Sequence, residues 1–190
     1  PDGRPRPELR AELRQIPNLH NLANVVFTLV APWSLIIGAA WIDAWWAVVV
    51  AFPFVGALQL RHFILHHEAA HRLLFSNRRA NDLIGINLLG WIPWGSGTHD
   101  YRRVHQAHHR DEFGPNEPDF LLYSLYPITR ASFWRKLRRD ALGVSAWRQV
   151  RPAFRGLVSP GERGTAIRFL GMQAAILTGF IVVGKPWRSE

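Results

Sequence analysis

Long apolar runs separated by polar, basic segments organise this chain. Residues 22–42 are apolar with only four interruptions, and a second apolar run starts at residue 44 after a single charge, Asp43. A third run occupies residues 167–184. Because a helix needs about 20 apolar residues to cross a bilayer, we expect transmembrane helices at about 22–42, 44–65 and 167–184.

The remaining segments are too short or too polar to span. Residues 83–94 form a twelve-residue apolar stretch, which we expect to lie in the membrane interface, and residues 96–165 should form a cytoplasmic region of helices and loops. The tryptophans around Asp43 predict an outer hairpin with an aromatic belt, whereas the basic flanks at 1–21 and 61–79 belong on the cytoplasmic side.

These elements predict an all-α fold: a polytopic membrane helical bundle with a cytoplasmic helical cap, formed by residues 1–190 as a single domain. The protein would then be an integral, multi-pass membrane protein. A buried helical hairpin in a soluble protein would give a similar pattern, but both N-terminal runs are long and free of charge, which favours the membrane.

Composition narrows the functional classes. The chain has 23 Lys+Arg against 14 Asp+Glu, but its basic blocks alternate with apolar blocks, a pattern that favours a membrane over nucleic acid as partner. It contains no Cys, which excludes disulfides, thiolate-bound zinc, iron–sulfur clusters and a thiol nucleophile. Eight of the nine histidines fall between residues 62 and 109.

The first histidine cluster consists of His67 and His71 in the sequence His67-Glu68-Ala69-Ala70-His71. Residues four apart share one face of a helix, so both imidazoles can reach one metal ion. The same five residues satisfy the H-E-x-x-H pattern, in which two histidines bind zinc and the glutamate is the general base of a peptidase. This motif alone leaves a hydrolase and an oxidoreductase open.

The second histidine cluster consists of His105, His108 and His109, which also share one helical face. Together the two clusters supply five imidazoles, more than a four-coordinate zinc ion can use, and this favours a site for two metal ions. Imidazole suits zinc, copper, iron and nickel, so the residues alone do not identify the metal.

The two clusters resemble the histidine boxes of the integral-membrane fatty acid desaturase family. The resemblance covers residues 58–139 and includes the run Tyr101-Arg102-Arg103-Val104 and the acidic Glu117-Pro118-Asp119. In that family H-x(3,4)-H and H-x-x-H-H boxes bind a non-haem di-iron centre at the cytoplasmic end of a helical bundle. The resemblance therefore implies two Fe ions, with the following ligands: His67, His71, His105, His108 and His109.

The resemblance implies an O2-dependent oxidoreductase that introduces a double bond into a fatty acyl chain, with no catalytic residues beyond the metal ligands. Its partners would be a lipid or acyl-carrier substrate, the membrane, and a separate ferredoxin-like or cytochrome-like electron donor. Related hydroxylases and carotenoid ketolases use the same scaffold. Two competing hypotheses are a membrane zinc peptidase that uses His67, Glu68 and His71, and a non-catalytic fragment whose histidines bind adventitious metal.

One feature departs from the family pattern. A third box, another H-x-x-H-H, is expected nearer the C-terminus, but no histidine follows His109. We therefore expect an N-terminal fragment of a longer desaturase; a complete but degenerate protein is the alternative. Either form should bind the metals poorly.

Several further residues are weaker candidates. We expect His62 and His66 to pack or to hydrogen-bond near the site, Glu68 to support the metal site, and His20 to lie at the interface; His99 could be a ligand or a neighbour of one. After Pro127 we expect an amphipathic helix that touches anionic headgroups or docks an acidic electron carrier or acyl-carrier headgroup. Its basic residues are Arg130, Arg135, Lys136, Arg138 and Arg139.

Overall fold

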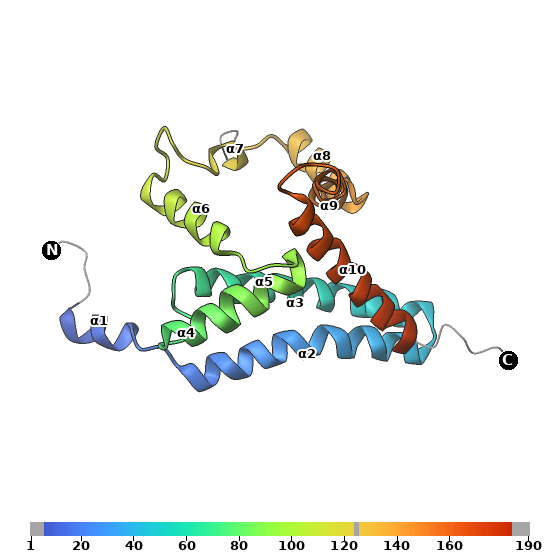
Figure 1. Cartoon of the computed structure of the whole chain (residues 1–190), viewed down its shortest axis with the longest axis horizontal. Coiled ribbons are helices and arrows are strands. Elements are labelled where there is room, and N and C mark those ends of the chain that lie inside the picture. Colours follow the sequence, from blue (N-terminus) through green and yellow to red (C-terminus); the bar gives the residue numbers. More distant parts are fainter. Residues whose placement is uncertain (1–5, 124–125, 184–190) are drawn as a thin grey trace. The chain divides into compact units, whose positions relative to one another are not determined.

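The computed structural model describes residues 6–123 and 126–183. Every regular element in these ranges is helical, in agreement with the predicted all-α class. Figure 1 shows the helices in sequence colours. Their bounds are α1 (Pro7–Leu13), α2 (Asn18–Ile42), α3 (Trp45–Ala70), α4 (Arg78–Ala80), the π-helix η1 (Asn81–Leu88), α5 (Leu89–Trp94), α6 (His99–Arg110), α7 (Phe120–Tyr123), α8 (Arg130–Ala141), α9 (Val144–Gly156) and α10 (Arg163–Val183).

The chain divides into two compact units. The first, called here the N-terminal unit, comprises residues 1–89 with residues 180–190, and the second, the middle unit, comprises residues 90–179. The first histidine cluster belongs to the N-terminal unit and the second to the middle unit.

The N-terminal unit is built on a hairpin of two long helices, α2 and α3, which pack side by side (Figure 1). The turn between them is short because Asp43 adopts a left-handed conformation that ends α2, and Ala44 is extended before α3 begins. Among the described residues, these two helices are the ones long and apolar enough to cross a membrane. They cover the first two predicted spans.

The hairpin leaves most of its apolar surface uncovered. Only 22% of the most apolar window of α2 and 11% of that of α3 is buried, whereas the core helix of a soluble protein is mostly buried. Bulky side chains such as Phe27, Val49 and Phe52 are exposed. A surface of this kind is stable against lipid, where the helical backbone already satisfies its own hydrogen bonds.

Beyond the hairpin, helix α10 covers most of the third predicted span, which stays a prediction. The predicted interfacial segment, residues 83–94, is helical throughout: it forms most of η1 and all of α5. Whether it lies in the interface also stays a prediction. The expected amphipathic helix after Pro127 is present as α8, with basic side chains in its last turn.

Asn81 fixes the chain just after α3. Its side chain is fully buried. The amide nitrogen donates to the carbonyl oxygen of Ala69 (2.9 Å), and the amide oxygen accepts from the backbone N–H groups of Leu74 (3.2 Å) and Phe75 (3.3 Å). These three bonds join the end of α3, the following turn and the start of η1.

Helix η1 then packs closely on α3. A Cβ atom at Gly85 would lie 2.2 Å from the Cβ atom of Ala69, so only glycine allows the two backbones to approach this far. At this contact η1 is a π-helix, with a bond from the Leu89 N–H to the Ile84 carbonyl that spans five residues. Short π-helical segments of this kind are frequent at functional sites.

We predict that Asn81→Leu destabilises the N-terminal unit. Leucine has a similar volume but leaves two buried N–H groups and one carbonyl without these partners, at a cost of about 1–3 kcal/mol for each group. The expected loss is at least about 3 kcal/mol, measured as a lower thermal unfolding midpoint in detergent. Asn87→Leu, at a partly exposed position of the same helix, is the control; equal midpoints for the two variants would contradict the prediction.

Candidate metal centre

The first histidine cluster lies at the C-terminal end of α3. His67 is in the last turn of this helix and His71 is its C-terminal cap, so the two rings lie on one face and meet edge to face, with their centroids 4.7 Å apart. Both residues are partly exposed, and the Glu68 carboxylate lies 3.4 Å from Nδ1 of His67. The pair thus presents imidazoles where the apolar hairpin ends.

The neighbouring histidines of α3 have a different role. The buried ring of His62 donates from Nε2 to the carbonyl oxygen of Leu89 (2.8 Å), and the buried ring of His66 donates from Nδ1 to that of Gly85 (2.9 Å). A carbonyl can only accept, so these bonds fix which nitrogen of each ring carries hydrogen. His66 thus holds η1, and His62 the start of α5, against α3, which agrees with the expectation of packing and hydrogen bonding.

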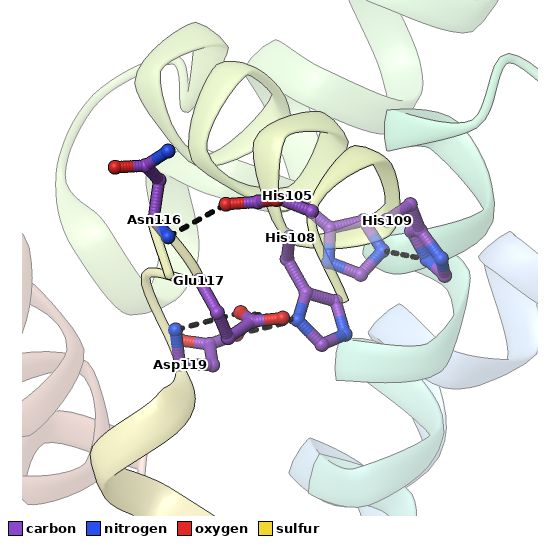
Figure 2. Close-up of polar contacts among 7 residues, drawn as sticks. His105, His108, His109, Asn116, Glu117 and Asp119 are labelled. Atoms are coloured by element: carbon purple, nitrogen blue, oxygen red, sulfur yellow. Dashed lines mark hydrogen bonds and ion pairs between the residues drawn. The ribbon is translucent and has the colours of Figure 1, made fainter. Parts of the chain in front are cut away.

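The second histidine cluster lies on the last two turns of α6. Nε2 of His105 and Nε2 of His109 are 3.1 Å apart, close enough for one ring to donate a hydrogen bond to the other. The ring of Tyr101 stacks on His105 with a centroid distance of 5.4 Å and an angle of 8°. The Nε2 atoms of His105 and His109 therefore face each other (Figure 2).

His108 has acidic partners instead. Its Nδ1 donates to Oε1 of Glu117 (2.7 Å) and lies 3.8 Å from Oδ2 of Asp119 (Figure 2). The ligand atoms of these three residues lie within 4.8 Å of one another. The Glu117 side chain is 0% exposed and that of His108 is 20% exposed. The pair is thus shielded from water.

The contact between these two residues alters both pKa values. The hydrogen bond to Glu117 raises the pKa of His108 above its ordinary 6.5, and the nearby carboxylate charges act in the same direction. Burial alone would raise the pKa of Glu117, but its bonds with His108 and with the N–H of Asp119 outweigh burial and hold the pKa below 4.5. Both shifts favour the charged pair.

The histidine pairs suit a metal ion by their chemistry and spacing. Two nitrogens that each lie about 2.1 Å from one ion, at a right angle, are about 3 Å apart. The 3.1 Å separation of His105 and His109 matches this value. Imidazole is a ligand for iron, copper, zinc and nickel, and the residues of both pairs can therefore hold such an ion.

Within the N-terminal unit the structure pairs His67 with His71. Within the middle unit it pairs His105 with His109 and places His108 beside two carboxylates. The sequence predicted all five histidines as ligands, which stays a prediction, but did not indicate the contact of Glu117 and Asp119 with His108. The sequence signal for this contact is the pair of acidic residues nine and eleven positions after His108. These residues contribute to the resemblance to the family, but their spacing does not indicate which histidine they contact. His99, at the start of α6, is exposed.

The comparison with protein families shows to which family of proteins the chain belongs. A family model described as fatty acid desaturase matches residues 43–187, which include α3, α6 and both histidine clusters. This chain belongs to the fatty acid desaturase family. Comparisons with curated proteins and with solved structures gave no match.

Membership of the fatty acid desaturase family confirms the resemblance carried by the two histidine clusters. The family consists of membrane-associated, oxidoreductase-type enzymes that use non-haem iron, and the apolar hairpin and the histidines of this chain fit that class. It also favours oxidation chemistry over a zinc peptidase at His67, Glu68 and His71.

We predict that Glu117→Gln lowers the pKa of His108 toward 6.5, because the neutral amide no longer favours the imidazolium ion. The measurement is a histidine NMR titration of the metal-free protein in detergent. Glu112→Gln removes a charge from the same loop without removing a hydrogen bond to His108, so it should change the pKa less.

The same shifts define a pH window. A raised histidine pKa adds stability that is complete below about pH 6.5 and disappears as pH rises through the folded value. A lowered glutamate pKa adds stability that is complete above about pH 4.5 and disappears as pH falls through the folded value. Glu117→Gln should therefore be most destabilising between these two pH values; a uniform effect at every pH would contradict the ion pair.

Proposed function

We propose that this protein is a membrane-bound, O2-dependent fatty acid desaturase, an enzyme that introduces a double bond into a fatty acyl chain. The observation that carries the proposal is the position of His67 and His71 at the end of an apolar two-helix hairpin, in a chain of the desaturase family. An acyl chain is apolar and needs lipid-facing or buried apolar surface beside the reacting atoms. The hairpin supplies this apolar surface, and the imidazoles at its end would place the metal beside the acyl chain.

The metal is the second part of the proposal. The following five histidines would hold two non-haem Fe ions: His67, His71, His105, His108 and His109. When bound, iron supplies the capacity to activate O2. Two hydrogens leave adjacent methylenes, and O2 with two further electrons and two protons gives two waters, so a separate ferredoxin-like or cytochrome-like donor is required.

The residues of this chain would prepare the site for that reaction. His66 holds η1, and His62 the start of α5, on α3 by hydrogen bonds to backbone carbonyls, which would keep the end of α3 in place. The partly exposed rings of His67, His71 and His105 remain accessible from outside their own helices. The exposed apolar faces of α2 and α3 would provide the contact with lipid.

The proposed topology is multi-pass, with three spans and both histidine clusters on the cytoplasmic side. The basic residues that follow the second span support this orientation through the positive-inside rule. The substrate would be an acyl lipid or an acyl-carrier thioester. The exposed arginines of α8 are a surface on which an anionic headgroup or an acidic electron carrier could bind.

We predict that cells expressing the complete gene product accumulate fatty acids with one additional double bond, which lipid mass spectrometry would detect as a loss of two hydrogens. His67→Ala and His105→Ala should each reduce this product below detection, because each removes a proposed ligand. His20→Ala, at an exposed position near the start of α2, should retain it.

Different products would redirect or overturn the proposal. A gain of one oxygen would identify a hydroxylase, and a keto product a ketolase, on the same scaffold. An unchanged acyl profile despite normal expression and a functional electron donor would count against oxidation of acyl chains.

We also predict that the purified complete protein contains iron rather than zinc, as measured by elemental mass spectrometry. Replacement of His105, His108 and His109 together by alanine should remove the iron, because the second cluster supplies three of the five proposed ligands. If the protein instead contains zinc, and if His71→Ala removes this zinc whereas the triple substitution does not, the result would support a peptidase site at the first cluster.

A further inference from the structure

Glu117 is a carboxylate in an unusual position for this part of the chain. The loop after α6 is polar and mostly exposed, yet the Glu117 side chain is 0% exposed. Burying a carboxylate is costly unless it is hydrogen-bonded. Here Oε1 accepts two bonds, from Nδ1 of His108 at 2.7 Å and from the backbone N–H of Asp119 at 2.9 Å.

The loop is shaped to return Glu117 to α6. Asp111, which caps α6, accepts a hydrogen bond at Oδ2 from the backbone N–H of Asn116 (2.7 Å). A Cβ atom at Gly114 would lie 2.1 Å from Oδ1 of Asp111, so a side chain at this position would disrupt the turn. The loop backbone thus directs Glu117 onto the ring of His108 (Figure 2).

This contact determines the chemistry of the His108 ring. An ionised carboxylate can only accept hydrogen bonds, so Nδ1 of His108 must carry the hydrogen. In the neutral ring the other nitrogen, Nε2, then has the unshared electron pair that a metal requires. The bond also fixes the orientation of the ring, because Glu117 is itself held by the Asp119 N–H.

The distances fit hydrogen bonding between Glu117 and Nδ1. Nδ1 and Oε1 are 2.7 Å apart, a normal length for a charge-assisted hydrogen bond. Asp119 is farther away, at 3.8 Å. Carboxylates commonly support metal-binding histidines in this way.

We propose that Glu117 is a positioning residue that holds His108 with hydrogen on Nδ1, so that Nε2 is the nitrogen presented to the metal. This inference rests on the proposed function, in which His108 is an iron ligand. It assigns a role to a residue outside the histidine boxes and specifies the binding nitrogen of His108.

The first test needs no metal. Nitrogen NMR of the metal-free complete protein, labelled at histidine and kept at a pH where the ring is neutral, should show His108 with hydrogen on Nδ1. The His108→Gln spectrum assigns the signal. In Glu117→Ala the ring loses its acceptor and should shift toward the Nε2–H form, whereas Glu112→Gln should leave the signal unchanged. Unfolding midpoints identify any variant that fails to fold.

The second test measures binding of Fe²⁺ to the same proteins under anaerobic conditions. Glu117→Ala should weaken binding about 10- to 100-fold, the usual effect of removing a residue that supports a metal-bound histidine. Glu117→Gln, which keeps an acceptor oxygen, should weaken it less. Glu112→Gln should bind as the unaltered protein does.

The outcomes separate the inference from the proposed function. If His108 keeps hydrogen on Nδ1 in folded Glu117→Ala, the positioning role is wrong whatever the metal content. If Glu117→Gln loses binding as completely as His108→Ala, Glu117 is a ligand and the positioning role is also wrong. If His108→Ala retains full Fe²⁺ affinity while Glu117→Ala shifts the tautomer, the ligand assignment fails but the control of the ring by Glu117 stands.

Discussion

The buried amide of Asn81 supports the arrangement around the first histidine cluster. Helix α3, the second helix of the apolar hairpin, ends at Ala70. The chain must then turn without leaving buried backbone groups unpaired. Asn81 meets this requirement for both ends of the turn. Because the turn is fixed, η1 can return along α3, and the carbonyl groups of Gly85 and Leu89 reach the histidines that precede the cluster.

Sequence patterns predicted the helical elements well because their signals are strong and local. Apolar length gave the first two long helices, and spacing of three and four residues brought His105, His108 and His109 onto one helix. The π-helical form of η1 could not be predicted in this way. It occurs where Gly85 lies against Ala69, a close approach that a pattern of apolar residues does not encode.

Sequence patterns also predicted only part of the candidate metal site. Histidine spacing identified the five proposed ligands but treated His105, His108 and His109 as equivalent. The structure distinguishes them: two rings face each other, and the third binds a buried carboxylate. That difference arises from the loop held by Asp111 and Asn116, whose course depends on hydrogen bonds rather than on hydrophobic periodicity. Family membership then gives the oxidoreductase class, which neither spacing nor geometry gives alone.

The π-helix η1 constrains how this part of the chain can change in length. A π-helical turn holds about one residue more than an α-helical turn. Loss of one residue within Asn81–Leu88 with the helix otherwise unchanged in form would turn every later position by roughly a quarter of a turn around the helix axis. The Leu89 carbonyl would then leave His62, even though no histidine had been altered. Insertions and deletions here are therefore restricted by the histidines of another helix.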